Sequence, residues 1–126
     1  MTFFIKGNVP SSKNSKQIFK NKKTGKTFIT SSKTVKAYLS NFEYQYDIFA
    51  KEFKEQLKSK AKPYKIGFYF VRDSKRKFDY ININQIVQDL MVQHNWIDDD
   101  NCEELIPVFL GYEVDRNNPG VRIEVL

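Results

Sequence analysis

The sequence predicts an α+β domain, with a mixed or antiparallel sheet and a long and a shorter helix packed on one of its faces. Short apolar segments typical of strands occur near the start, in the middle and near the end of the chain. Two segments between them place apolar residues at steps of three and four, as amphipathic helices do. The length of 126 residues and the apolar fraction of 40% suit one domain, 1–126, with a single core.

The first third of the chain predicts a strand followed by a hairpin. "TFFIKGNV" (Thr2–Val9) has the pattern of a strand, and the turn formers of "PSSKNS" predict a loop after it. "KQIFKNKKTGKTFIT" predicts a basic hairpin at about residues 15–30, with a lysine-rich turn at Asn21–Lys26. Lysines on a projecting hairpin suit phosphate contacts, and a solvated loop is the alternative.

The segment from Ser32 to Lys60 predicts the long helix, capped at its start by Ser31 or Ser32. Its apolar stripe comprises Val35, Leu39, Phe42, Tyr46, Phe49, Phe53 and Leu57. We expect most of this stripe to pack against the sheet, although a helix of this length also leaves room for a dimer contact.

The second half of the chain predicts a strand, the shorter helix and two further strands. "YKIGFYFVR" (Tyr64–Arg72) follows Pro63 and leads into the basic turn "DSKRK". The helix is predicted from about Asn82 to Gln93, with a polar face and with a buried face of Ile83, Ile86, Val87, Leu90 and Met91. "IPVFLGYEV" and "VRIEVL", separated by the turn "DRNNPG", predict the last two strands.

The charge of the chain is unevenly distributed. The net charge is +6, and residues 1–42 contain nine lysines and no acidic residue. Such one-sided charge favours a polyanion as partner, with nucleic acid ahead of a membrane because no basic amphipathic helix opens the chain. A merely soluble, lysine-rich surface is the alternative.

The numbers of Cys and His residues and the hydropathy of the chain exclude several classes of protein and of metal site. One Cys cannot form an internal disulfide, and one Cys with one His cannot make a conventional structural zinc site. Apolar runs are too short to span a bilayer, and no secretory leader pattern opens the chain, so we expect a cytoplasmic protein. Any metal would be bound by oxygen ligands, which favours Mg²⁺ or Mn²⁺.

Carboxylates gather in one part of this basic chain. Asp79 follows the basic turn, Asp89 lies on the predicted shorter helix, and Asp98, Asp99 and Asp100 follow that helix. A helix followed by a returning loop offers a way to bring the third group near the first two, and converging carboxylates are best tolerated around a cation. The alternative is a turn residue, an exposed helix position and a solvated acidic loop.

The stretch "KFDYININQIVQDL" followed by "WIDDDN" resembles the signature of RusA-type Holliday junction resolvases, the crossover junction endodeoxyribonucleases often encoded by phages. The pattern of that family is D-x-D-N-x-x-K-x-x-x-D-x-L, then an aromatic residue and D-D. The matching residues are Asp79, Asn82, Asp89, Trp96, Asp98 and Asp99, and Leu90 lies one position before the Leu of the pattern. The segments "GNVPSSKN" and "PGVRIEVL" are similar to the early loop and the closing strand of the family.

Two positions depart from the family pattern. Ile81 stands where the family has its second Asp, and Gln85 stands where it has Lys. In the family these two positions belong to the catalytic set, together with the counterparts of Asp79 and Asp99. The resemblance implies a homodimeric, magnesium-dependent enzyme that cuts four-way junctions symmetrically. A junction-binding protein of the same fold with impaired catalysis is the alternative.

The resemblance and the residues together define the expected site. We expect Asp79 and Asp99 to bind the metal directly, with Asp89 and Asp100 as supporting or substitute ligands, and Asn82 to orient a ligand or cap the helix. The residues expected to contact DNA phosphates are Lys13, Asn14, Lys16, Lys22, Lys23, Lys26, Lys75, Arg76 and Lys77.

Overall fold

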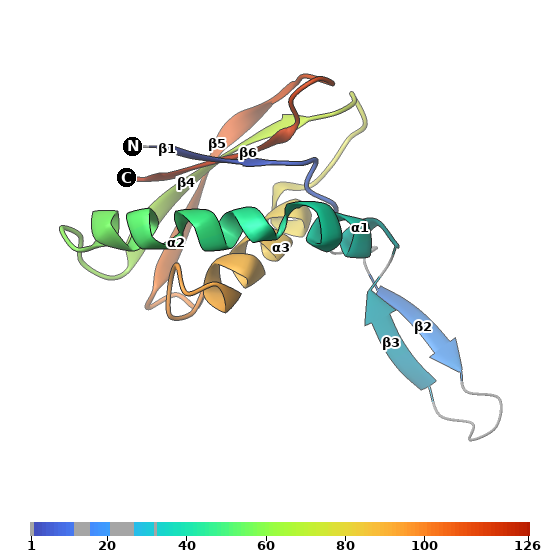
Figure 1. Ribbon diagram of the computed structural model, residues 1–126, viewed down its shortest axis with the longest axis horizontal. Helices are drawn as coiled ribbons and strands as arrows, with labels where there is room; N and C mark the ends of the chain where they lie inside the picture. The colour runs from blue at the N-terminus through green and yellow to red at the C-terminus, as the bar shows by residue number, and fades with distance from the viewer. Residues whose placement is uncertain (1, 12–15, 21–26, 32) are drawn as a thin grey trace.

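The computed structural model describes residues 2–11, 16–20, 27–31 and 33–126 and confirms the α+β class (Figure 1). The strands are β1 (Thr2–Lys6), β2 (Lys16–Lys20), β3 (Thr27–Ser31), β4 (Tyr64–Arg72), β5 (Leu105–Val114) and β6 (Gly120–Val125). The helices are α1 (Lys33–Phe42), α2 (Tyr44–Leu57) and α3 (Tyr80–Gln93). Strands and helices therefore follow one another in the order that the sequence predicts, except that the long helix is divided in two.

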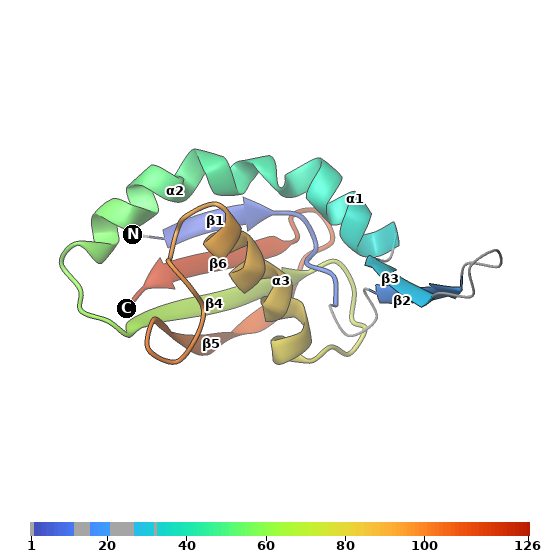
Figure 2. The ribbon, with the colours of Figure 1, turned by 90° about the horizontal axis from the view of Figure 1, so that it is seen from below.

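The main sheet has four strands in the order β1-β6-β4-β5 and is mixed. β6 pairs antiparallel with both β1 and β4, whereas β4 and β5 are parallel. Figure 1 shows α2 and α3 on the same side of this sheet, and Figure 2 shows α3 crossing its strands while α2 runs alongside β1. Alternate strand residues point to that face, so Ile66, Phe68 and Phe70 of β4 are fully buried beneath the helices.

The predicted hairpin is present as a separate two-stranded sheet. β2 and β3 pair antiparallel, with Ile18 opposite Ile29 and Phe19 opposite Phe28. Figure 1 shows this hairpin standing apart from the four-stranded sheet. The lysine-rich turn at Asn21–Lys26 lies outside the described residues.

The predicted long helix is two helices that meet at Glu43. Its apolar stripe nevertheless faces the core as expected: Val35, Tyr46, Phe53 and Leu57 are buried, and Leu39, Phe42 and Phe49 pack against them. Figure 2 shows α1 and α2 forming an arc along the β1 side of the sheet.

The break has a physical cause in the buried side chain of Gln45. Gln45 Nε2 donates to the carbonyl oxygen of Phe42 at 3.1 Å and to that of Lys6 at 2.9 Å, and its Oε1 accepts from the Lys6 amide at 2.8 Å. The amide of Tyr46 bonds instead to the carbonyl of Glu43, at 3.0 Å. A side chain inserted into the helical hydrogen-bond ladder interrupts the helix, and here the same side chain joins α2 to β1.

α3 has the predicted buried face and starts two residues earlier than predicted. Ile83, Ile86, Val87, Leu90 and Met91 are all buried. Ile81 lies within the first turn of the helix and is 73% exposed. Neither a carboxylate nor a core contact therefore occupies the position where the family has its second Asp.

Replacing Gln45 by Leu should lower the free energy of unfolding by about 2–3 kcal/mol, because it leaves the Lys6 amide and carbonyl without their partner. Urea unfolding followed by circular dichroism measures the change. The matched control is Gln93→Leu at an exposed position at the end of α3, which should change stability by less than about 0.5 kcal/mol. Equal effects of the two substitutions would contradict this role of Gln45.

Candidate nucleic-acid interface

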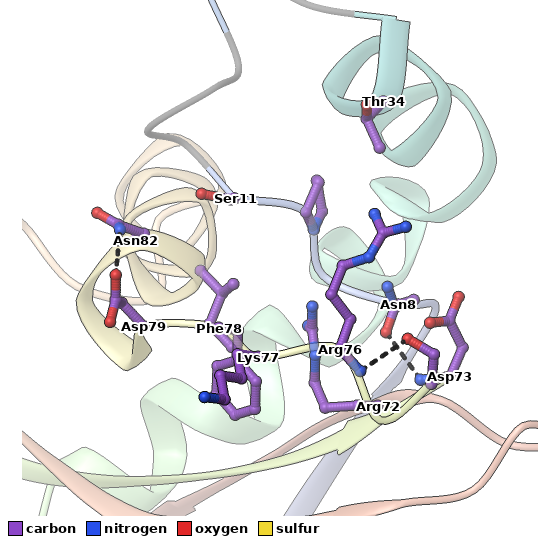
Figure 3. A pocket seen from close by; sticks show the side chains of 13 residues that line it. Asn8, Ser11, Thr34, Arg72, Asp73, Arg76, Lys77, Phe78, Asp79 and Asn82 are labelled. Carbon is purple, nitrogen blue, oxygen red and sulfur yellow. Dashed lines mark hydrogen bonds between the residues drawn. The ribbon is translucent and has the colours of Figure 1, made fainter.

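A polar pocket of about 790 Å³ lies where β1 and β4 end and α3 begins. Its lining comes from three segments far apart in the sequence: Asn8–Ser11, Thr34 of α1, and Arg72–Ile83. Figure 3 shows Asp79, Asn82 and Ser11 on one side, and Arg72, Arg76, Asn8 and Asp73 on the other. The pocket thus joins the early turn-forming loop to the segment that carries the central motif.

The early loop is fixed to the end of β4 by two hydrogen bonds. Arg72 Nη1 donates to the Val9 carbonyl at 2.7 Å, and the Asp73 amide donates to Asn8 Oδ1 at 3.1 Å. The Arg72 guanidinium also lies 4.8 Å from the centre of the Phe78 ring, and burial lowers its pKa. Arg72 therefore positions the walls of the pocket, a role that the sequence analysis did not assign to it.

Asp79 stands at the N-terminus of α3 with its carboxylate exposed. Its backbone carbonyl accepts from the amides of Asn82 and Ile83, as an N-cap residue does, but its side chain makes no cap hydrogen bond. Asp79 Oδ2 instead accepts from Asn82 Nδ2 at 3.1 Å. Asn82 thus bonds to the Asp79 carboxylate, and the N-cap position, the alternative predicted for Asn82, belongs to Asp79.

Only two of the three positive residues at the end of the basic turn line the pocket. Arg76 and Lys77 line the pocket, and Lys75, also exposed, does not. Lys16 is the first residue of β2. Lys13, Asn14, Lys22, Lys23 and Lys26 lie outside the described residues. Asn8, Ser11 and Thr34 line the pocket without having been predicted. Of these, only Ser11 lies in the run of turn formers after the first strand, and no signal in the sequence pointed to Thr34.

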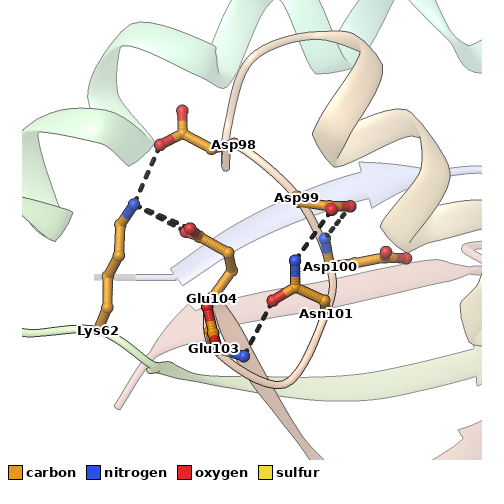
Figure 4. A network of polar contacts seen from close by, with 7 residues as sticks. All are labelled: Lys62, Asp98, Asp99, Asp100, Asn101, Glu103 and Glu104. Atoms are coloured by element: carbon orange, nitrogen blue, oxygen red, sulfur yellow. Dashed lines mark hydrogen bonds and ion pairs between the residues drawn. The ribbon is translucent and has the colours of Figure 1, made fainter.

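The acidic loop after α3 lies at the opposite end of that helix (Figure 4). Lys62 pairs with Asp98 at 3.1 Å and with Glu104 at 2.8 Å, and both carboxylates raise the pKa of Lys62. Asp99 accepts from the Asp100 amide at 2.8 Å and from Asn101 Nδ2 at 3.0 Å, and these bonds lower its pKa. Each of these carboxylates is thus satisfied within the loop or by a lysine.

The remaining predicted ligands pair with amides along α3. Asp89 Oδ1 accepts from Gln85 Nε2 at 2.8 Å, four residues away on the exposed face. Asp100 Oδ2 accepts from Gln88 Nε2 at 3.2 Å, and Gln88 in turn accepts from the buried Asn84 at 2.7 Å. This chain of amides fastens the acidic loop to α3.

The four carboxylates predicted to bind the metal do not come together in the fold of a single chain. Gln88, the partner of Asp100, lies nine positions after Asp79, which corresponds to about 13 Å along the helix axis. Within the described residues, no group of three or more His, Cys, Asp or Glu side chains is placed to hold a metal ion. The described residues therefore do not fit a centre built from Asp79, Asp89, Asp99 and Asp100.

Asp79 by itself fits the mode in which Mg²⁺ is held by one or two carboxylates, with water and substrate phosphate as its other ligands. Its carboxylate is exposed in a pocket that also presents Arg76 and Lys77, which are suited to phosphate. The pocket can thus accommodate a phosphate group beside an oxygen-ligated cation.

Trp96 of the motif and the nearby His94 have structural roles. Trp96 is buried, and its Nε1 donates to the Tyr46 carbonyl at 2.6 Å. His94 Nδ1 lies 2.5 Å from Asp47 Oδ1, which ties the end of α3 to α2. Both residues belong to the packing between the helices, far from the pocket at the start of α3.

No protein-family model matches this chain, and no curated protein matches it. Among the residues that the structure describes, no helix is both long enough and apolar enough to cross a membrane.

Proposed function

We propose that this protein is a RusA-type endonuclease that binds branched DNA and cuts its backbone with the help of a divalent metal ion. The observation that carries the proposal is the pocket that joins Asn8–Ser11 to Arg72–Ile83. These segments include residues in which the sequence resembles the early loop and the central motif of that family, and sixty residues separate them. Two segments that contact the same substrate must line the same pocket, and these two segments do.

Phosphate is the ligand that suits this pocket. Arg76 and Lys77 supply positive charge, while the side chains of Asn8 and Ser11 add polar groups that bind phosphate oxygens. The β2–β3 hairpin lies in the sequence between Ser11 and Thr34, both of which line the pocket. We therefore expect the hairpin to contribute to the same DNA-binding surface.

Asp79 is the residue to which we assign metal binding, with Asn82 holding its carboxylate in place. Bound Mg²⁺ or Mn²⁺ would supply a Lewis acid that polarises the phosphate and lowers the pKa of a water ligand. Arg76 and Lys77 would orient the phosphate and stabilise the negative charge that develops on its oxygens.

Junction binding without cleavage is the second candidate, and two observations favour it. Gln85, which replaces the lysine of the family, is neutral and is already bonded to Asp89. Asp79 is separated from the other predicted ligands along α3. A cleavage assay on a four-way junction decides between the two candidates.

Replacing Arg76 and Lys77 together by Ala should weaken binding to a synthetic four-way junction about 10- to 100-fold at about 0.1 M salt, because two phosphate contacts are lost. The slope of log affinity against log salt should flatten by about 2. Fluorescence anisotropy across a salt series measures both quantities.

The matched control for this pair is Lys51→Ala with Lys54→Ala on α2, which removes the same charge from exposed positions outside the pocket. The control should bind within about threefold of the parent protein. If both double variants lose affinity equally, the net charge and not the pocket governs binding.

Asp79→Asn should abolish Mg²⁺- or Mn²⁺-dependent cleavage of the junction, because it removes the metal-binding carboxylate from the pocket. Binding of the junction should be retained or improved, since a negative charge near phosphate is removed. Gel analysis of labelled junctions, beside linear duplex, measures cleavage, and Glu52→Gln at an exposed position on α2 is the control. A parent protein that binds junctions but cuts none with either metal would make the binding protein the correct account.

A further inference from the structure

A second pocket, of about 500 Å³, adjoins the pocket of Figure 3. It is formed by the loop that follows β1, by α1 and by the turn between β5 and β6. Asn8, Thr34 and Asp73 line both pockets, so the two share a wall. We call the pocket of Figure 3 the phosphate pocket and the second one the asparagine pocket. The proposed function leaves the asparagine pocket without a role.

The wall of the asparagine pocket is largely apolar and includes an aromatic ring. Phe42, the last residue of α1, lines the pocket and is partly exposed. Its ring centre lies 5.6 Å from that of the buried Tyr38, and the ring packs against Gly7, where a Cβ atom would overlap it. The fold therefore holds this ring in place. A nucleobase can stack on such a ring, whatever its sequence identity, because every base has a π-face.

Three carboxamides also line the asparagine pocket. Asn41 of α1 and Asn117 and Asn118 of the turn before β6 are exposed, and no described residue bonds to their side-chain amides. The turn is fixed to the end of β1, because the Gly7 amide donates to the Pro119 carbonyl at 2.9 Å. Carboxamides both donate and accept hydrogen bonds, as the edges of nucleobases do.

The two pockets differ in charge. Three cationic and two acidic side chains line the phosphate pocket, which gives it a net charge of +1. One lysine, Lys6, and one aspartate, Asp73, line the asparagine pocket, so its net charge is zero. A nucleotide shows the same division, since one sugar joins a charged phosphate to a neutral base. A positive pocket beside a neutral pocket with a ring and amides matches these two parts.

We infer that the asparagine pocket receives the base of an unpaired nucleotide whose phosphate lies in the phosphate pocket. The base stacks on Phe42, and its edge bonds to the carboxamides of Asn41 and Asn118. A base inside a duplex is stacked and paired, and it must leave the helix to reach a pocket. This costs least where the base is already unpaired. The protein therefore selects DNA with an unpaired nucleotide over continuous duplex.

This inference rests on the proposed function for the position of the phosphate, and it names the class of DNA that the site selects. The asparagine pocket shares only Asn8, Thr34 and Asp73 with the phosphate pocket, so its own side chains can be tested separately.

Three DNA duplexes of equal length test the inference: one fully paired, one with a single unpaired thymidine, and one with an abasic residue in place of that thymidine. The last two carry the same phosphates and differ only in one base. The parent protein should bind the duplex with the unpaired thymidine at least about 10-fold more tightly than either of the others, because one stacked base is gained. Fluorescence anisotropy measures the three dissociation constants. Equal affinity for the thymidine and the abasic duplex overturns the inference.

Asn41→Ala with Asn118→Ala removes two carboxamides from the asparagine pocket. This variant should bind the thymidine duplex at least about fivefold more weakly than the parent and the abasic duplex within about twofold of the parent. Gln56→Ala with Gln93→Ala removes two carboxamides outside both pockets and is the matched control, which should change neither affinity. A preference for thymidine that the asparagine variant keeps in full overturns the assignment to this pocket.

Photocrosslinking locates the base without any change to the protein. 5-Iododeoxyuridine, which has nearly the shape of thymidine, replaces the unpaired nucleotide, and irradiation joins it to an aromatic ring on which it stacks. Mass spectrometry of the digested complex should find the crosslink at Phe42. A crosslink confined to other segments of the chain overturns the inference.

Failure of the base pocket and failure of the proposed function are distinguishable. Arg76→Ala with Lys77→Ala should weaken binding of the thymidine and the abasic duplex by the same factor, because both contain the phosphate. If it does so and the parent does not distinguish the two duplexes, the inference fails and the proposed function stands. A parent that prefers the thymidine duplex but neither binds nor cuts four-way junctions supports the base pocket and contradicts the proposed function. A parent that binds no DNA overturns both.

Discussion

The parallel pairing of β4 with β5 is the constraint on which the placement of the candidate site residues depends. Tyr64 lies opposite Leu105 at one end of the pair, and Arg72 lies opposite Val114 at the other. Parallel strands begin at the same end of a sheet. The segment that connects β4 to β5 must therefore run back along the whole length of β4. α3 makes this return. The segment that enters α3 therefore forms the pocket at one end of the sheet, and the segment that leaves it forms the acidic loop at the other.

This separation sets the electrostatics of the two ends. At the pocket, the Asp79 carboxylate stands near the positive end of the α3 dipole, with Arg76 and Lys77 beside it. At the other end, the carboxylates follow the negative end of the α3 dipole, so each of them needs its own hydrogen-bond donor. Lys62 serves Asp98, and Gln88 serves Asp100. A separate local donor therefore binds each of these two acidic side chains.

The pocket also depends on how β1 ends. Gln45 holds the backbone of Lys6 against the junction of α1 and α2, and the next residue, Gly7, turns the chain with a φ of 113°. A side chain at Gly7 would overlap the ring of Phe42, so only glycine allows this close passage. The turn directs Asn8 toward Asp73 at the pocket. The buried amide of one glutamine is thus connected, through three consecutive residues of the chain, to the geometry of the proposed phosphate site.

The sequence by itself determined the class of the fold, the order of its elements and the buried faces of the helices, because periods of two and about 3.6 residues are local properties. The parallel direction of β5, the break at Glu43 and the distance between Asp79 and Asp99 were decided only by the tertiary structure. Gln45 interrupts the helix through Lys6, which is 39 residues away, and no local pattern encodes that partner. The carboxylates are close in sequence yet lie toward opposite ends of α3, because a crossover between parallel strands must span the sheet.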